Sequence, residues 1–228
     1  MIIIVPIFLL LLAVTVFGVV RFSNAVATYG DVEIQSGSGA AVAEKVLLNA
    51  GVEGVEVVER DILLSDYYDA TRRKLVLSKE SFANTTAAAV GIAIHELGHA
   101  IQQMEGGGRV LAKRLSSIRM AHLLGGLMFW IPIIMGIFRV MNFRIAILVI
   151  LFSWAVLMFY GLLTIGVEFD ASNRGLRALE KLRLLRTVKE REAVEAIVHA
   201  SAWQRCGDVL RSPQLVLYYL LPFAGWKK

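Results

Sequence analysis

The chain has very little cysteine. Among its 228 residues, only Cys206 carries a thiol. A single cysteine excludes a disulfide framework and a zinc site built from several thiolates. Internal repeats and low-complexity segments are also missing, which excludes a repeat architecture.

A concentrated basic region is missing as well. The net charge is +5, but the basic residues are scattered, and many of them flank apolar stretches. Such residues are placed to meet lipid headgroups, so the charge pattern predicts a lipid bilayer and no nucleic acid as a partner.

What the sequence has in excess is apolar residues, which make up 57% of the chain. This exceeds what an ordinary soluble domain contains. Three uncharged windows approach or exceed the roughly 20 residues that cross a bilayer: residues 2–20, 120–138 and 145–167. The last two are separated only by residues 139–144, which favours a hairpin of two membrane helices over buried core helices.

The first window does not resemble a cleaved signal peptide. It has no basic residue ahead of its apolar core and no clear small-x-small cleavage site. We therefore expect an uncleaved transmembrane anchor at residues 1–21.

A His-Glu-x-x-His pattern stands at residues 95–99. On a helix, positions i and i+4 lie on the same face, so His95 and His99 can point two imidazoles at one metal ion. Zinc lowers the pKa of a bound water to about 7. Glu96 can then act as general base toward this water and return the proton to the leaving amine.

An ordinary helix with two histidines and a solvated glutamate is the alternative interpretation. The apolar run at residues 87–94 argues against it, because it indicates that the helix is buried where the pattern begins. Buried histidine and glutamate side chains need partners, and a metal supplies them. His and carboxylate ligands also accept divalent ions other than zinc.

The local patterns around this motif predict several elements. We expect a helix at residues 40–50 ended by Gly51, strands at residues 55–59 and 74–77, and a turn or loop at residues 66–69. Ser78 or Asn84 is expected to cap the motif helix, and the glycines at 106–108 to end it. Residues 175–203 have the spacing of two helices broken near Thr187. The apolar stretch at residues 215–226 is left unassigned.

A catalytic zinc needs a third protein ligand. The candidates are His122, His199, Glu105, Glu168 and Asp170. The motif helix ends near Glu105, and the two histidines fit packing roles better. Two crossings lie between His99 and Glu168, so the chain returns to the side it left. A charged Glu168 at the exit of an apolar helix is costly unless it is paired, so we choose it, with Asp170 as an outer partner to an imidazole.

These patterns predict a mainly α membrane protein with about three transmembrane helices and a small α+β zincin-like catalytic domain containing a short sheet. The expected organisation is an anchor at residues 1–21, a catalytic core at 22–119, a transmembrane hairpin at 120–167 and a C-terminal helical part at 168–228. Basic residues near the membrane ends are more numerous on the catalytic side than in the hairpin loop. This bias predicts a multi-pass protein of the cell membrane with a cytoplasmic catalytic side.

The combined pattern resembles the YugP-type membrane zinc metallopeptidases of prokaryotes. The matching segments are residues 38–51, 64–69, 74–78, 93–102 and 168–174. The family has a His-Tyr-Asp-Pro pattern where this chain has Tyr67, Tyr68, Asp69 and Ala70, so no role of the missing histidine is assigned here.

A more distant likeness is to the membrane gluzincins that process prenylated proteins or clear damaged membrane proteins. They place a membrane hairpin between the histidine pair and a glutamate ligand in a Glu-x-x-x-Asp pattern. Here Ser172 stands in the Asp position. The resemblance supports Glu168 as a ligand and implies peptide-bond hydrolysis.

The resulting hypothesis is a membrane-anchored zinc metalloendopeptidase that acts on a peptide or protein substrate, with zinc on His95, His99 and Glu168. Tyr67 or Tyr68 is a candidate donor to the oxyanion, against an ordinary packing role. An intramembrane protease is less favoured, because polar residues 84–86 interrupt the apolar stretch and no Asp-Gly motif follows in a later apolar window. A non-catalytic metal-binding adaptor or scaffold and a purely structural membrane protein are the alternatives. The sequence does not indicate the oligomeric state.

Overall fold

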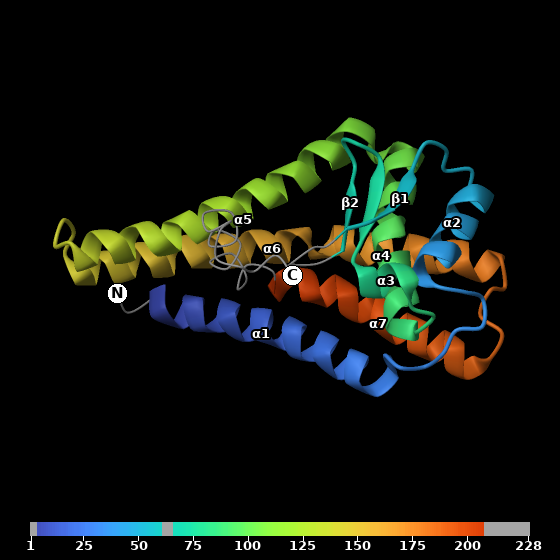
Figure 1. Ribbon diagram of the computed structural model, residues 1–228. Helices are drawn as coiled ribbons and strands as arrows, with labels where there is room; N and C mark the ends of the chain where they lie inside the picture. The colour runs from blue at the N-terminus through green and yellow to red at the C-terminus, as the bar shows by residue number, and fades with distance from the viewer. Residues whose placement is uncertain (1–3, 61–65, 208–228) are drawn as a thin grey trace. The chain divides into compact units, whose positions relative to one another are not determined.

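The structure is a computed structural model that describes residues 4–60 and 66–207, without the side chains of residues 4, 107–122 and 206. It is mostly helical, with one small sheet (Figure 1). The elements are α1 (Ile4–Tyr29), α2 (Gly39–Asn49), β1 (Glu56–Glu59), β2 (Tyr67–Asp69), β3 (Lys74–Leu77), α3 (Lys79–Ala83), α4 (Ala87–Gln102), the π-helix η1 (Gln103–Gly107), α5 (Gly108–Ile137), α6 (Phe143–Lys181) and α7 (Val188–Gly207).

The chain divides into two compact units. Among the described residues, one contains residues 4–17, 116–164 and 206–207, and the other contains residues 18–60, 66–115 and 165–205. We call the second one the motif unit, because it holds the residues 95–99. The long helices α1, α5 and α6 each contribute residues to both units.

The sheet of the motif unit has the order β1-β3-β2. β1 is parallel to β3, with Val57 opposite Leu75, and β2 is antiparallel to β3, with Tyr68 opposite Leu75. The strands predicted at residues 55–59 and 74–77 are confirmed. The turn predicted at residues 66–69 is wrong, because residues 67–69 form β2. A run of three residues is too short to show the alternation of apolar and polar side chains that marks a strand. Its extended conformation depends on pairing with β3.

The predicted helix at residues 40–50 is confirmed as α2. Ser38 caps it by accepting a hydrogen bond from the Ala41 amide, and Gly51 follows it with a positive φ of 67°. The expected cap of the motif helix is wrong. Ser78 caps the short helix α3, whereas Thr86 caps α4 by accepting from the Ala89 amide. Both hydroxyl residues satisfy free amides at a helix start, so sequence pattern alone does not separate the two helices.

The end of the motif helix lies where the glycines predict it. Gly106 has a φ of 131°, which interrupts regular helical geometry between α4 and α5. The break between the two C-terminal helices is also confirmed, because α6 ends at Lys181 and α7 begins at Val188. Thr187 accepts from the Glu190 amide, and the Glu190 carboxylate in turn accepts from the Thr187 amide, as in a capping box. The carboxylate also accepts from the Arg186 amide.

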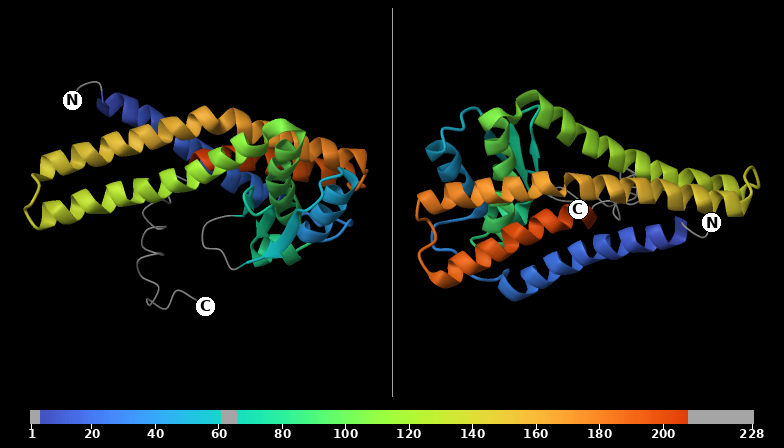
Figure 2. Two further views of the ribbon diagram at one scale, coloured as in Figure 1. Left: turned by 90° about the horizontal axis from the view of Figure 1, so that it is seen from above. Right: turned by 180° about the vertical axis from the view of Figure 1, so that it is seen from behind.

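Helix α4 is the centre of the motif unit. It lies between the sheet on one side and the C-terminal part of α6 on the other, as the three views show together (Figures 1 and 2). All of its residues except Ala88 and Ile92 are buried. A helix that is apolar nearly all round is expected in such a position, and its few polar side chains are therefore forced into the interior.

Two helices are long and apolar enough to cross a membrane, Val5–Tyr29 and Phe143–Lys181. Within the described residues, the apolar helix Leu123–Ile137 is shorter. The third crossing predicted at residues 120–138 belongs to α5 and stays a prediction, because part of it lies outside the described side chains.

Candidate metal centre

The two histidines of the motif point from α4 toward a common space. Their ring centroids are 5.4 Å apart, and the rings are inclined by 80°. Both side chains are almost fully buried, with exposed fractions of 1% for His95 and 2% for His99. The i, i+4 spacing on a helix produces this pairing directly.

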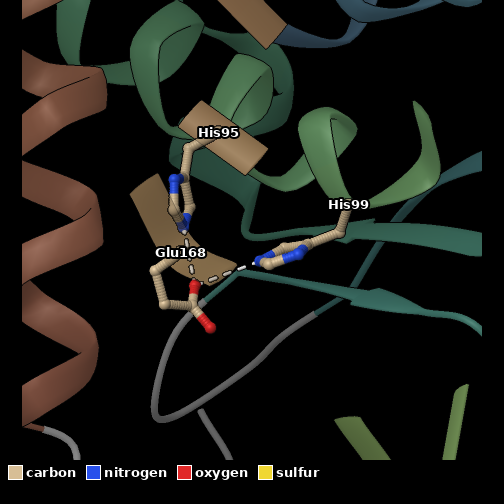
Figure 3. A group of neighbouring side chains, drawn as sticks. All are labelled: His95, His99 and Glu168. Carbon is tan, nitrogen blue, oxygen red and sulfur yellow. Dashed lines mark hydrogen bonds and ion pairs between the residues drawn. The ribbon is translucent and has the colours of Figure 1, made fainter. Parts of the chain in front are cut away.

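Glu168 reaches the same space from α6 (Figure 3). Its Oε2 lies 3.1 Å from His99 Nε2 and 3.4 Å from His95 Nε2. The ligand atoms of the three residues lie within 4.8 Å of one another. Two imidazole nitrogens and one carboxylate oxygen form a donor set that zinc accepts.

The approach of α6 to α4 depends on two glycines. A Cβ at Gly98 would lie 2.0 Å from the carbonyl oxygen of Ala171, and one at Gly175 would lie 2.3 Å from that of Ile94. Only residues without a side chain permit such close backbone contact. Glu168, Ala171 and Gly175 recur at i, i+3 and i+7, so the face of α6 that packs on α4 also carries the carboxylate.

His95 has a neutral partner on its outer nitrogen. Its Nδ1 lies 2.8 Å from Ser172 Oγ, and this hydroxyl donates its proton to the carbonyl oxygen of Val198 at 3.1 Å. Since the hydroxyl proton is used, Ser172 accepts from the N–H at Nδ1. The Nε2 atom of His95 therefore carries the lone pair that faces Glu168 and His99.

That lone pair supports a metal at this place. Among the residues that the structure describes, none makes a hydrogen bond to the buried His95 Nε2. A buried polar atom without a partner is costly, and a metal ion would satisfy it. The donor types and the orphaned nitrogen both fit zinc.

The two histidines differ in protonation behaviour. Burial lowers the pKa of His95 to about 4, so its imidazole is neutral, as ligation requires. Burial also lowers the pKa of His99, but the charge of Glu168 and the hydrogen bonds that Glu168 and Gln102 accept from the ring raise it by more. The net pKa of His99 is therefore above its ordinary value, because a carboxylate stands beside it.

Glu96 is buried next to the two histidines and is held from two sides. Its Oε2 accepts a hydrogen bond of 3.2 Å from the Tyr68 backbone amide in β2. Its Oε1 pairs with the Arg205 guanidinium, which also donates to the Asp66 carbonyl oxygen at 3.1 Å and lies 3.8 Å from Glu168 Oε2. The sheet and α7 thus orient the carboxylate that the motif assigns as a base.

Three of the other residues named as candidate ligands, Asp170, Glu105 and His199, lie outside the cluster. Asp170 accepts from Gln102 Nε2 at 2.7 Å and from Arg174 Nε at 2.8 Å, and Glu105 pairs with Arg174. His199 packs beside Phe169, with ring centroids 6.3 Å apart. The side chain of His122 lies outside the described part of the chain.

The Tyr68 hydroxyl contacts a residue outside the donor cluster, and its role as a donor to the oxyanion stays a prediction. The hydroxyl is buried and donates to Gln103 Oε1, and burial raises the pKa of Tyr68 to about 12. Its contribution to the site is the backbone amide that holds Glu96. Tyr67 has other interactions within the chain and stays a prediction.

Sequence reasoning missed Arg205 and Gln102. Arg205 is 109 residues from Glu96, and no local pattern connects them. Gln102 could have been found, because it follows His99 by three positions and therefore lies on the same side of the helix.

A buried pair of helical histidines, joined by a glutamate from a second helix, defines a centre that could hold a metal ion of the metallohydrolase kind. The comparisons with known proteins agree with this class. The model of a family described as "Putative neutral zinc metallopeptidase" matches residues 1–223, and the chain belongs to this family.

One curated relative is the "Putative membrane protease YugP" of Bacillus subtilis (strain 168). It is 30% identical over 198 residues, covering 86% of this chain and 85% of the relative. No solved structure matches the chain. The family resemblance expected from the sequence is thus confirmed, and zinc is the metal of the family.

Proposed function

We propose that the protein is a membrane-anchored zinc metalloendopeptidase in which His95, His99 and Glu168 hold the metal. The single observation that supports this most is the convergence of three buried donor atoms from α4 and α6 within 4.8 Å. When bound at such a site, zinc lowers the pKa of a water molecule to about 7 and polarises a carbonyl group.

Glu96 is the general base in this proposal. Its carboxylate follows the first histidine ligand directly, and the Tyr68 amide and Arg205 fix its orientation. It takes a proton from the attacking water and delivers it to the leaving amine. Because Glu96 is 3% exposed, its proton is shielded from exchange with bulk solvent during this transfer.

The test is the hydrolysis of fluorescein-labelled casein by Glu96→Gln in detergent, with zinc content measured on the same sample. We expect a loss of about 10²–10⁴-fold in turnover with zinc retained, because the amide keeps the shape but cannot accept the proton. Glu44→Gln, at an exposed position of α2, is the matched control and should hydrolyse casein as the wild type does.

Full activity in Glu96→Gln would contradict this assignment of the base. Zinc binding without hydrolysis by the wild type, on casein and on a peptide library, would favour a metal-binding adaptor or scaffold. The partner expected under the proposal is a peptide or protein substrate, including membrane-associated ones.

The proposal is that the motif unit lies on the cytoplasmic side of the cell membrane and that α5 crosses the membrane in addition to α1 and α6. The excess of basic residues near the membrane ends on the catalytic side supports this orientation. Val140, in the connection between α5 and α6, is 70% exposed and is a suitable reporter.

In a Cys206→Ser background, Val140→Cys should react with a membrane-impermeant maleimide added to intact cells. Arg191→Cys, at an exposed position of α7, should react only after the cells are permeabilised. The reverse pattern would overturn the orientation.

A further inference from the structure

The outer nitrogen of His99 is held by Gln102. His99 Nδ1 lies 2.9 Å from Gln102 Oε1, and both side chains are buried, with 8% of Gln102 exposed. Gln102 is the last residue of α4 and follows His99 by three positions, so one helix face carries both.

The orientation of the Gln102 amide is fixed by its other contacts. Its Nε2 donates to the carbonyl oxygen of Val167 at 3.0 Å and to Asp170 Oδ2 at 2.7 Å. A carbonyl and an ionised carboxylate only accept hydrogen bonds, so the amide nitrogen must face them and the amide oxygen must face His99. Since this oxygen also only accepts, the proton of the neutral imidazole is on Nδ1 and the lone pair is on Nε2.

Asp170 is itself held in place. It accepts from Arg174 Nε at 2.8 Å, one turn further along α6, and Arg174 also pairs with Glu105 in η1. Val167 and Asp170 stand on either side of Glu168 in the chain. The segment of α6 that carries Glu168 therefore also supports the partner of His99.

We infer that Gln102 is a positioning residue for the metal centre. It sets the His99 tautomer so that the lone pair on Nε2 is available to the metal. Asp170 and Val167 keep the Gln102 amide from flipping. This inference rests on the proposed zinc site. For His95 a different kind of group, the hydroxyl of Ser172 on α6, holds the outer nitrogen.

Gln102→Ala tests the inference through zinc affinity, measured in detergent by competition with a fluorescent zinc chelator. We expect the dissociation constant for zinc to rise about 10–100-fold, as is usual when an outer partner of a metal-bound histidine is removed. Gln103→Ala is the matched control, because Gln103 bonds to Tyr68 and Ala70 rather than to a histidine. It should bind zinc as the wild type does.

A second variant separates positioning from packing. Gln102→Met keeps the length and most of the volume of the side chain but has no amide oxygen to accept from His99 Nδ1. We expect it to bind zinc as weakly as Gln102→Ala. If Gln102→Ala does not fold, as judged by circular dichroism, Gln102→Met carries the test alone.

Two results would overturn the inference: zinc affinity in Gln102→Ala equal to that of Gln103→Ala, or a folded Gln102→Met that binds zinc as tightly as the wild type. A wild-type protein that binds no zinc would instead overturn the proposed site on which the inference rests. The wild-type measurement therefore distinguishes the two failures.

Discussion

Helix α6 contains two regions of opposite character in one continuous run from Phe143 to Lys181. Residues 143–164 belong to one compact unit and expose large apolar side chains, with Phe152 62% and Leu163 62% exposed. Residues 165–181 belong to the motif unit and bury polar groups, with Glu168 3% and Ser172 0% exposed.

This contrast follows from the surroundings that each region requires. Exposed phenylalanine and leucine side chains along a helix fit a lipid environment, where no energy is lost by leaving them uncovered. A buried carboxylate needs compensating partners, and for Glu168 these are the Arg205 guanidinium at 3.8 Å and the candidate metal position that it shares with His95 and His99. The helix thus joins an apolar segment to a donor of the candidate metal centre without a break.

A charged side chain introduced into the apolar region tests the contrast between the two regions of α6. Val156 is 50% exposed near the middle of this region, and Val156→Lys should disfavour membrane insertion by about 2.5–3.5 kcal/mol. Asn173→Lys, at an exposed position in the polar region of the same helix, is the control and should insert as the wild type does. The fraction of each protein recovered in carbonate-washed membranes measures the effect.

Equal membrane recovery of the two lysine variants would contradict the assignment of residues 143–164 to the lipid environment. Loss of membrane recovery in Asn173→Lys alone would place the lipid-facing region at the other end of the helix.

A single added methyl group tests how closely the polar region of α6 approaches α4. Gly175→Ala should destabilise the metal-free protein by about 1–3 kcal/mol, because its Cβ would lie 2.3 Å from the Ile94 carbonyl oxygen. Gly166→Ala, in the same helix, meets nothing within 4 Å and should be neutral or stabilising by up to about 1 kcal/mol.

Thermal unfolding in detergent, followed by circular dichroism, compares the two alanine variants. A Gly175→Ala protein as stable as Gly166→Ala would mean that α4 and α6 do not approach as closely as the structure indicates.

The sequence predicted the parts of this molecule that depend on local physics. The ends of α2, the strands β1 and β3 and the break before α7 are marked by capping residues, glycine and alternating apolar residues. The strand β2 was not predicted, because three residues carry no periodicity and their pairing depends on β3.

In the candidate site, too, some residues follow from the sequence and others only from the folded chain. The pair His95 and His99 follows from helical spacing, and the choice of Glu168 followed from counting membrane crossings. Their roles as ligands remain proposals, although the structure brings the three together. Arg205 could not be predicted, because its contact with Glu96 depends on how α7 packs in the folded chain.

The most direct test of the account is the zinc content of the purified protein in detergent, compared between wild type, Glu168→Ala and Glu180→Ala. Glu180 is an exposed acidic residue of the same region of α6 and is the matched control. We predict about one zinc per chain in wild type and Glu180→Ala, since three protein ligands hold such a metal, and loss of zinc in Glu168→Ala. Full zinc in Glu168→Ala, or no zinc in the wild type after reconstitution, would contradict the proposed metal centre.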